Sequence, residues 1–238
     1  MTPPPVAPDT PSARAGRSRS VLREVLIIIV VALLLSALVR TFLLQAFWIP
    51  SGSMENTLLR EDRVVVSKIG TRVSGIERGE VVVFRDPSDW LPPVADSGNE
   101  VQRAVRNGLE FVGLAPSRSD RDLVKRVIGV GGDRVVCCDA EGRVTVNGTP
   151  LDEGDYIYPG DAPSQQAFDI TVPQGKLWVM GDHRSASGDS RVHLDDPAGP
   201  FVDESDVVGR AMWVVWPLSR LASLPVPDTF ADVAPAGG

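Results

Sequence analysis

One uncharged apolar run, residues 25–39, constrains the possible folds of this chain more than any other feature of its sequence. As a helix, these 15 residues would cover about 22 Å, which is less than the ~30 Å hydrocarbon core of a bilayer. A helix continued through Arg40 to Phe47 contains 23 residues and covers about 34 Å, which is long enough to span. Arg40 would then lie near one interface and could extend its guanidinium toward water.

A cleaved secretory signal peptide is the alternative explanation of this run, since a basic segment precedes it. However, no small-x-small cleavage site follows where one is needed, because apolar residues continue past Arg40. We therefore predict a single transmembrane helix over residues 24–47. Residues 1–23 carry four arginines and one acidic residue, so we expect a disordered, basic cytoplasmic tail, with the remainder of the chain outside the cell membrane.

The composition of the chain excludes several classes of function. A hydrophobic fraction of 43% fits neither a polytopic membrane protein nor a disordered chain. The formal net charge of -7 provides no basic field to capture phosphates, so we expect no nucleic-acid partner. The two cysteines, Cys137 and Cys138, are adjacent, which is a poor geometry for a disulfide, and we predict free thiols. Two cysteines and two histidines show no zinc-ligand spacing, so the sequence predicts no metal site.

After the apolar run, the pattern changes to short runs of β-branched residues with charged or glycine-containing breaks between them. Such a series is typical of a mainly antiparallel β domain, which we place over residues 48–222. The runs lie at residues 63–68, 80–84, 123–130, 134–136, 143–146, 176–180 and 207–216. Asn147-Gly148 predicts a two-residue hairpin turn. Residues 98–114 predict a peripheral helical or loop insertion, and residues 223–238 predict a flexible tail rich in Pro, Ala and Gly.

Ser53 stands out among the serines because of its setting shortly after the apolar run. Pro50 fixes one backbone angle and Gly52 frees another, so the chain can turn sharply and expose the Ser53 hydroxyl. Trp48 and Ile49 would hold this segment at the membrane surface. An exposed hydroxyl in such a turn is a candidate nucleophile, although a capping serine at an interfacial turn has the same local sequence.

An activated serine needs a nearby base, and the sequence offers two kinds. His183 follows Asp182, which leaves a Ser/His/Asp triad open. Lys125 lies in an otherwise apolar strand beside Arg126, and alternation should direct one of the two inward. Burial can lower a lysine pKa from about 10.4 toward about 7 to 8, whereas arginine stays protonated. A solvated strand lysine is the simpler alternative for Lys125.

A third polar cluster, residues 181–191, follows the run at 176–180 and combines small polar residues with Asp and Arg. Such a loop can orient a base through hydrogen bonds and ion pairs. A plain polar surface loop has the same composition, so this cluster gains meaning only together with the other candidate residues.

Four separate stretches form a pattern behind the apolar run. They are Pro50-Ser51-Gly52-Ser53-Met54 with Thr57-Leu58; Asp62–Lys68 with Arg78–Phe84; Lys125–Gly129 with Gly132-Asp133; and Gly181-Asp182 with Arg184, Ser187, Asp189, Ser190 and Arg191. Together they resemble the sequence boxes of bacterial type I signal peptidases, which are membrane-bound Ser/Lys proteases. The resemblance extends over residues 25–216, and four boxes in the order of the family are far more specific than one.

The resemblance implies a role for each matching residue. Ser53 would be the nucleophile, Lys125 the general base, and Ser51 would join the Ser53 backbone N–H in the oxyanion hole. The supporting residues, which would orient the base and hold its loop, are Ser187, Asp189 and Arg191. The family's substrate pockets are small and shallow and accept Ala-x-Ala before the cut. The matching pocket positions are Phe47, Ile49, Met54, Leu58 and Val124.

The chain departs from the family pattern at several loop positions. Asn56 replaces the usual proline after the nucleophile, which predicts a less rigid turn there. Gly131 replaces a proline in a Gly-Pro-Gly-Asp-like turn. His183, Ser185 and Ala186 replace the commoner Asn, Asp and Asn. None of these positions is a proposed catalytic group, so His183 becomes a substitution in a structural loop and the triad loses support.

The resemblance implies a membrane-anchored serine endopeptidase that removes N-terminal signal peptides from secreted preproteins after a small-x-small site. It also implies a single-pass protein with a cytoplasmic N-terminus and an antiparallel β-sheet catalytic domain, with a small inserted β subdomain at about residues 137–176. The expected partners are secretory preproteins and membrane lipid. The enzyme would act as a monomer and would need no cofactor or metal.

Two other functions stay open at the level of the sequence. An autoprotease of the SOS-repressor kind has a similar Ser/Lys pair, but it would be expected to carry a DNA-binding N-terminus where this chain has a predicted anchor. A non-catalytic β domain tethered to the membrane would bind cell-envelope proteins. The presence of both a nucleophile and a base counts against that second alternative.

Overall fold

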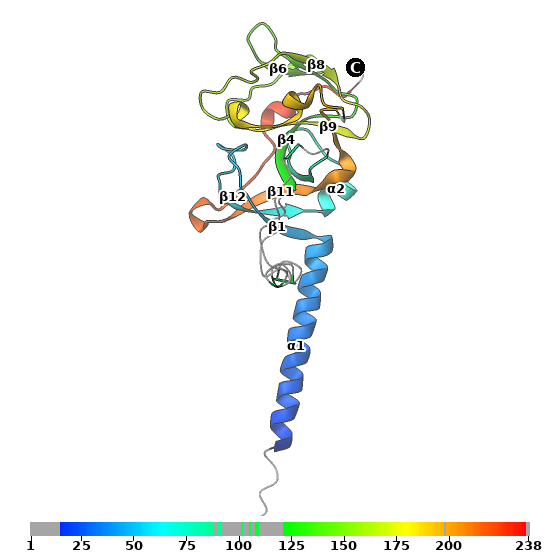
Figure 1. Ribbon diagram of the computed structural model, residues 1–238, viewed down its shortest axis with the longest axis vertical. Coiled ribbons are helices and arrows are strands. Elements are labelled where there is room, and N and C mark those ends of the chain that lie inside the picture. The colour runs from blue at the N-terminus through cyan, green and yellow to red at the C-terminus, as the bar shows by residue number, and fades with distance from the viewer. Residues whose placement is uncertain are drawn as a thin grey trace, which may run out of the picture.

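The protein consists of a β-rich body and one long N-terminal helix, α1 (Ala15–Phe42), which projects away from it (Figure 1). The structure, a computed structural model, describes residues 15–87, 90–91, 101, 105, 108–109, 121–197 and 199–236. Most of the insertion predicted at 98–114 lies outside the described residues. The described positions within it are helical.

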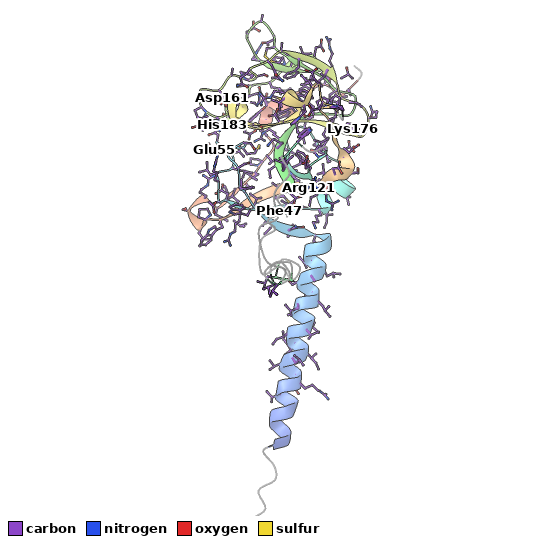
Figure 2. All side chains as sticks on the ribbon, viewed as in Figure 1. Phe47, Glu55, Arg121, Asp161, Lys176 and His183 are labelled. Carbon is purple, nitrogen blue, oxygen red and sulfur yellow. A yellow bond between two sulfur atoms is a disulfide. The ribbon has the colours of Figure 1, made fainter. Side chains whose placement is uncertain are left out.

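Helix α1 contains the whole apolar run and leads directly into the body. Its apolar side chains point outward and are largely exposed, for example Ile28 at 66% and Leu34 at 65% (Figure 2). Among the described residues, no helix has the combination of length and mean hydropathy expected of a membrane span. The transmembrane segment at 24–47 therefore stays a prediction. Its predicted helical end is wrong, because the chain leaves the helix at Phe42 and residues 44–48 form a strand. The disorder predicted for residues 1–23 is wrong for residues 15–23, which belong to α1, since no proline interrupts them and a formed helix extends readily.

Eight strands form the main sheet, and the pairings among the described residues are antiparallel. The strand order is β1-β2-β11-β3-β4-β9-β10, with β12 paired to β11. The strands are β1 (Leu44–Trp48), β2 (Arg63–Ser67), β3 (Val81–Arg85), β4 (Asp122–Val130), β9 (Lys176–Met180), β10 (Val202–Asp203), β11 (Val207–Trp216) and β12 (Ala222–Ser223). This arrangement confirms the predicted mainly antiparallel β fold.

A second, four-stranded sheet follows β4 along the chain, in the order β7-β6-β5-β8. It is made of β5 (Arg134–Cys137), β6 (Val144–Val146), β7 (Thr149–Pro150) and β8 (Phe168–Thr171). Asn147 and Gly148 have φ angles of 52° and 81° and form the two-residue turn between β6 and β7, as predicted. The small sheet begins at Arg134, a few residues before the subdomain predicted at about 137–176.

Short helical segments connect several of these strands. They are α2 (Ile69–Val73) and the 3₁₀ turns η1 (Arg184–Ala186), η2 (Ser190–His193), η3 (Glu204–Asp206), η4 (Leu218–Arg220) and η5 (Asp228–Phe230). Two of them, η1 and η2, belong to the polar loop that the sequence marks at residues 181–191.

Strand β4 is buried on both faces because it lies between β3 and β9 and is covered by different apolar clusters. Val127 belongs to one cluster and Ile128 to another, and both side chains are fully buried. Lys125 and Arg126 are consequently each only 2% exposed. The expectation that only one of these two side chains points inward is wrong, since neither face of this part of the strand meets solvent.

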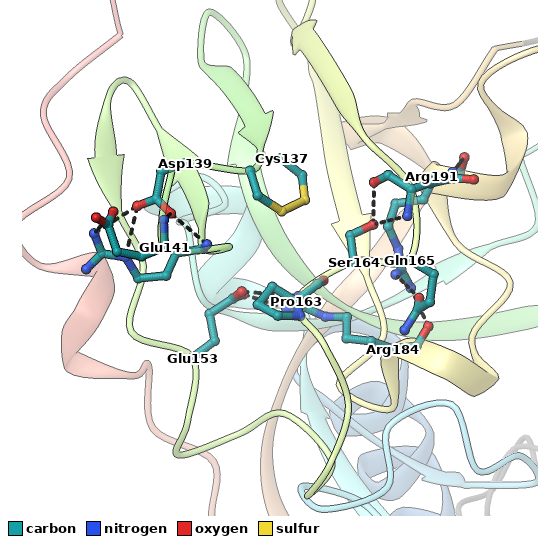
Figure 3. The surroundings of a disulfide bond; sticks show 12 residues. Cys137, Asp139, Glu141, Glu153, Pro163, Ser164, Gln165, Arg184 and Arg191 are labelled. Carbon is teal, nitrogen blue, oxygen red and sulfur yellow. Dashed lines mark hydrogen bonds and ion pairs between the residues drawn. A yellow bond between two sulfur atoms is a disulfide. The ribbon is translucent and has the colours of Figure 1, made fainter.

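Cys137 and Cys138 form a disulfide, so the prediction of free thiols is wrong (Figure 3). Their Cα atoms lie 2.9 Å apart, which is the spacing across a cis peptide bond, and the bond between them is cis. The prediction of free thiols was based on the strain that a bridge between adjacent residues places on the intervening peptide.

The C-terminal segment packs against the body over part of its length, which differs from the flexible tail predicted at 223–238. Phe230 and Val233 are 6% and 7% exposed and belong to the same apolar cluster. The Phe230 ring stacks on Tyr156, with 6.2 Å between centroids. It also lies against Gly79, where an added Cβ would be 2.6 Å from the ring. Isolated apolar anchors of this kind form no periodic pattern, so composition alone indicated disorder.

Replacing Phe230 by Ala should lower the free energy of unfolding by about 3 kcal/mol, because a buried aromatic ring would be lost from a packed site. Urea denaturation of the full chain in detergent measures this change. The substitution Asp232→Ala, at an exposed position two residues away, is the matched control and should change stability by less than about 0.5 kcal/mol. Equal effects of the two substitutions would show that this segment contributes no packing.

Candidate active site

The segment between β1 and β2 folds into a compact turn that carries Ser53, and we call residues 49–58 the Ser53 turn. The base of the turn is closed by Ile49, whose N–H donates to Asp62 O at 3.0 Å and whose carbonyl accepts from Glu61 N–H at 2.9 Å. Ser53 is only 8% exposed. The hydroxyl is therefore enclosed by neighbouring residues, whereas the sequence predicted that it would be exposed.

Asn56 occupies the position where the resembling family has a proline, and the structure shows how it is held. Its φ angle is 87°, which a proline cannot adopt. Its Nδ2 donates to Ile157 O at 3.0 Å, which connects the Ser53 turn to a distant part of the chain. The less rigid turn predicted here is not supported, since a tertiary hydrogen bond takes the place of the ring constraint.

Lys125 reaches Ser53 from strand β4, where it lies opposite Val82 of β3. Its Nζ lies 2.7 Å from Ser53 Oγ and 3.2 Å from Val124 O. A solvated strand lysine is excluded, since Lys125 is 2% exposed. The fold thus brings together two groups that are 72 residues apart and that the sequence marked independently.

Burial lowers the pKa of Lys125 from 10.5 to about 8. The negative charges of Asp189 and Asp182 oppose this shift by favouring the ammonium form, and the positive charge of Arg191 adds to it. Desolvation is the largest of these effects. A lysine with this pKa is partly neutral near pH 8, and a neutral amine can accept the proton of the Ser53 hydroxyl.

Arg126 and Asp182 form a buried ion pair on the other side of β4. Arg126 Nε and Nη2 donate to the carboxylate at 2.9 Å and 2.6 Å, and Nη1 donates to Gly79 O at 2.8 Å. Thr57 Oγ1 donates to the same carboxylate at 2.5 Å. Asp182 therefore connects β4 with the Ser53 turn. The sequence analysis did not predict this ion pair. The signal for it was the presence of opposite charges within one apolar run, at Arg126, and shortly after another, at Asp182.

Residues 181–191 form a buried loop rather than a plain surface loop. Asp189 accepts from Gly181 N–H at 2.9 Å and from Arg191 Nε and Nη2, each at 2.8 Å. Burial alone would raise the pKa of Asp189, but the hydrogen bonds and charge of Arg191 and the Gly181 N–H keep it below its usual range. Arg191 also donates to Arg184 O at 2.9 Å, so both ends of the loop are tied together.

A second buried ion pair supports this loop from the side of the small sheet. Arg184 Nη2 lies 2.5 Å from Glu153 Oε1, and both side chains are buried. Arg184 Nη1 donates to Pro163 O at 2.5 Å (Figure 3). The loop that approaches Ser53 is therefore held by both sheets of the protein.

Gly181 and Ser187 pack directly against the Ser53 turn. A Cβ on Gly181 would lie 2.2 Å from Ser187 Oγ and 2.5 Å from Ser53 O, so only glycine permits this approach. Ser187 Oγ is buried and has no well-formed hydrogen bond among the described residues, although it is close enough to Asp189 to help lower the pKa of that carboxyl. The predicted role of Ser187 in orienting Lys125 stays a prediction.

Ser51 lies at the exposed edge of the Ser53 turn, and its Oγ is 3.4 Å from Ser53 Oγ. Within the described part of the chain, the Ser53 N–H takes part in no hydrogen bond. The two donors expected for an oxyanion hole, a hydroxyl and an unused backbone N–H, therefore lie next to the candidate reacting oxygen.

The five residues predicted to line substrate pockets gather in one apolar cluster. Four are buried, with exposures of 4% for Phe47, 2% for Ile49, 1% for Met54 and 0% for Leu58, and Val124 is the partly buried member that packs against them. Four of these five residues therefore belong to the hydrophobic core beside the Ser53 turn. Their role in binding substrate stays a prediction.

His183 contacts the Ser53 turn away from the hydroxyl. Its Nδ1 lies 3.2 Å from Gly52 O and 3.3 Å from Glu55 Oε2, and Figure 2 shows the His183 and Glu55 side chains on the same side of the body. Ser53 Oγ, in contrast, lies within hydrogen-bond distance of Lys125. The geometry therefore favours the lysine over the histidine as the base.

Comparison with known proteins identifies the family. The family described as "Signal peptidase, peptidase S26" matches residues 22–216. The chain belongs to this signal peptidase family. A probable signal peptidase I of Mycobacterium leprae is 41% identical over 232 residues, which cover 86% of this chain and 79% of that protein. The signal peptidase I of Mycobacterium tuberculosis strain H37Rv is 40% identical over 223 residues, with coverages of 85% and 75%.

More distant relatives extend the same relationship. The signal peptidase IB of Staphylococcus aureus strain N315 is 31% identical over 214 residues, which cover 84% of this chain and 92% of that protein. A solved signal peptidase I of Enterococcus faecalis V583 is 21% identical and covers 57% of this chain and 95% of that chain, but its TM-score of 0.33 is too low to add support. The predicted serine endopeptidase of the signal peptidase I kind, which removes signal peptides, is confirmed by the family and its relatives.

With Lys125 as the general base, cleavage should rise with pH and level off above about pH 8, because the amine must lose its proton before it can accept one from Ser53. Below this pH, the neutral fraction of the amine falls about tenfold for each unit. The pH profile of kcat on a preprotein, measured with the full chain in detergent, checks this. A midpoint near about 6.5 would instead indicate a histidine, and a profile flat from about pH 6 to about 9 would rule out both bases.

Proposed function

We propose that Ser53 and Lys125 form a catalytic dyad that removes signal peptides after a small-x-small, typically Ala-x-Ala, site. The observation that carries the proposal is the 2.7 Å distance between Lys125 Nζ and Ser53 Oγ. The lowered pKa of Lys125 supports it, because only a neutral amine can act as the base. The family and its relatives supply the class of substrate, which is a secretory preprotein.

In the proposed reaction, neutral Lys125 removes the Ser53 proton as Ser53 Oγ attacks the carbonyl carbon after the second small residue. The new C–O bond places negative charge on the former carbonyl oxygen. The Ser51 hydroxyl and the Ser53 N–H donate to this oxygen, and one such donor is worth about 3 to 4 kcal/mol. The carbonyl then reforms as the scissile C–N bond breaks, and the Lys125 ammonium gives its proton to the leaving amine.

The second half of the reaction releases the signal peptide from Ser53. A water molecule enters beside Lys125, gives a proton to the neutral amine and attacks the acyl ester. Collapse of this second intermediate breaks the bond to Ser53 Oγ, and Lys125 returns the proton to that oxygen. No step requires a metal or cofactor.

The supporting residues keep the dyad in place in this proposal. Asp189 and Arg191 shape the loop whose Gly181 lies against Ser53 O. Ser187, which is buried next to Gly181, would orient the amine of Lys125. These residues act on the position of the reacting groups and take no proton themselves.

The substrate binds in an extended conformation beside a strand of the main sheet in the proposed complex. Strand β1 suits this role, because it lies at one end of the strand order and leads directly into the Ser53 turn. The pocket side chains would be the apolar cluster that contains Phe47, Ile49, Met54, Leu58 and Val124. Because four of them are buried, little depth is left for a side chain, which is consistent with a preference for alanine.

The proposed enzyme works as a monomer at the outer face of the cell membrane, anchored by a single N-terminal segment. Support comes from the exposed apolar side chains of α1 and from the arginines of residues 1–23, which favour a cytoplasmic N-terminus. In this arrangement, residues 48–222 form the extracytoplasmic peptidase domain. Tethering enzyme and preprotein to one lipid surface raises their effective concentration.

The dyad is tested by cleavage of a preprotein with an Ala-x-Ala site by the full chain in detergent. Ser53→Ala and Lys125→Ala should each lower kcat by about 10⁴-fold or more, because neither nucleophile nor base has a substitute nearby. His183→Ala should keep readily measurable cleavage.

The remaining outcomes separate the alternatives. Full activity of Lys125→Ala would exclude the dyad, and a His183→Ala loss as large as that of Ser53→Ala would restore the triad. If the wild-type chain itself failed to cleave, a binding function would be favoured. Circular dichroism of each variant checks that folding is unchanged.

A further inference from the structure

His183 lies between the Ser53 turn and Tyr158, and the proposed dyad gives it no function. Its imidazole stacks on the Tyr158 ring, with 4.0 Å between centroids and 14° between planes. Its side chain is 17% exposed. Its Nδ1 lies 3.2 Å from Gly52 O and 3.3 Å from Glu55 Oε2, and its backbone N–H donates to Ser53 O at 3.1 Å. One residue thus contacts two successive carbonyl groups on either side of the nucleophile's Cα.

The neighbours of Nδ1 determine which way its hydrogen bond runs. Gly52 O is a backbone carbonyl and can only accept, and an ionised Glu55 carboxylate can also only accept. Nδ1 must therefore carry a proton, whether the ring is neutral or charged. The imidazole Nδ1–H therefore donates to the Gly52 carbonyl.

The Gly52 carbonyl and the Ser53 N–H belong to the same peptide group. In a planar trans peptide these two bonds point in opposite directions, so the direction of one fixes the direction of the other. A hydrogen bond accepted by the carbonyl also polarises the peptide and strengthens its N–H as a donor. The hydrogen bond from His183 to Gly52 O therefore constrains the direction of the Ser53 N–H, which points to the opposite side of the peptide.

We propose that His183 is a positioning residue for the oxyanion hole, which holds the Gly52–Ser53 peptide so that the Ser53 N–H points at the developing oxyanion. The inference rests on the proposed function of Ser53. It deepens that function by assigning a task to a position at which this chain departs from the pattern of the resembling family.

The surroundings of the turn show why this peptide needs an external anchor. Residue 52 is a glycine, and a Cβ there would meet only the ends of flexible side chains, such as Glu55 Oε1 at 2.5 Å. Glycine has the widest backbone freedom of all residues, and by itself it would leave the peptide plane poorly fixed. The imidazole is held by stacking on the Tyr158 ring. Tyr158 is itself held in place because its N–H donates to Asp182 O at 2.9 Å.

Three substitutions at this position separate a donor role from a packing role. His183→Phe keeps a ring that can stack on Tyr158 but removes the Nδ1 proton. His183→Asn places an amide nitrogen on the same Cγ, at the position of Nδ1, and so keeps a donor. His183→Gln carries the same amide one carbon farther out and moves the donor away from Gly52 O.

Single-turnover and steady-state cleavage of an Ala-x-Ala preprotein are measured for the full chain in detergent. We expect His183→Phe and His183→Gln to lower kcat about tenfold with KM changed less than about twofold, since the Ser53 N–H would be misdirected rather than removed. His183→Asn should recover most of the wild-type kcat. Thermal unfolding is recorded for each variant. If His183→Phe is unfolded at the assay temperature, the comparison of kcat between His183→Asn and His183→Gln tests the proposal.

His193 offers a matched control, because it is also stacked on an aromatic ring, Trp90, and its Nδ1 also contacts a carboxylate, Asp196. His193→Phe should leave kcat within about twofold of wild type. The proposal is overturned if His183→Phe has wild-type kcat, if His183→Asn is no more active than His183→Gln, or if the substitutions change KM rather than kcat. The dyad would still stand in those cases as long as Ser53→Ala is inactive, whereas an active Ser53→Ala would refute the dyad itself.

Discussion

The burial of the Lys125 ε-amine is the constraint on which the rest of the candidate site depends. Removing a lysine from water disfavours its charged form, and this lowers the pKa to about 8 despite two nearby carboxylates. The burial follows from the position of β4. This strand lies between β3 and β9 in the sheet, and different apolar clusters cover its two faces. The same lysine on a solvated strand would stay charged and could not accept a proton from Ser53. The lowered pKa of the amine is therefore a property of the sheet rather than of the residue type.

Buried ion pairs lie on both sides of Lys125 and Ser53. Arg126 satisfies Asp182 on one side, and Arg191 satisfies Asp189 on the other, so each carboxylate has an arginine partner within 2.6 to 2.9 Å. An uncompensated carboxylate beside Lys125 would favour the ammonium form and raise its pKa. Such pairs add little net stability compared with apolar packing, but they are expensive to break, and this makes them effective at fixing the geometry of loops.

Parts of this fold could be predicted because their causes are local. Short β-branched runs and the Asn147-Gly148 turn depend on neighbouring residues, and both were predicted correctly. The disulfide between Cys137 and Cys138 and the packing of Phe230 were missed. The packing of Phe230 depends on contacts with distant residues, which leave no pattern in the adjacent sequence. The residue type of Asn56 likewise predicts a less rigid turn, whereas its hydrogen bond to Ile157 O, a distant residue, supplies the constraint.

The sequence by itself determined the ingredients of this protein: an apolar N-terminal run, a β domain, a serine in a Pro-Ser-Gly-Ser turn and a lysine in an apolar strand. Residue types and their order along the chain are sufficient for these, because each follows from composition or local spacing. Only the tertiary structure decided that Lys125 rather than His183 meets Ser53 Oγ, and that His183 instead contacts the Gly52 carbonyl. Distances between residues far apart in sequence depend on how the strands pair and on what covers each face of the sheet, and no local pattern records either.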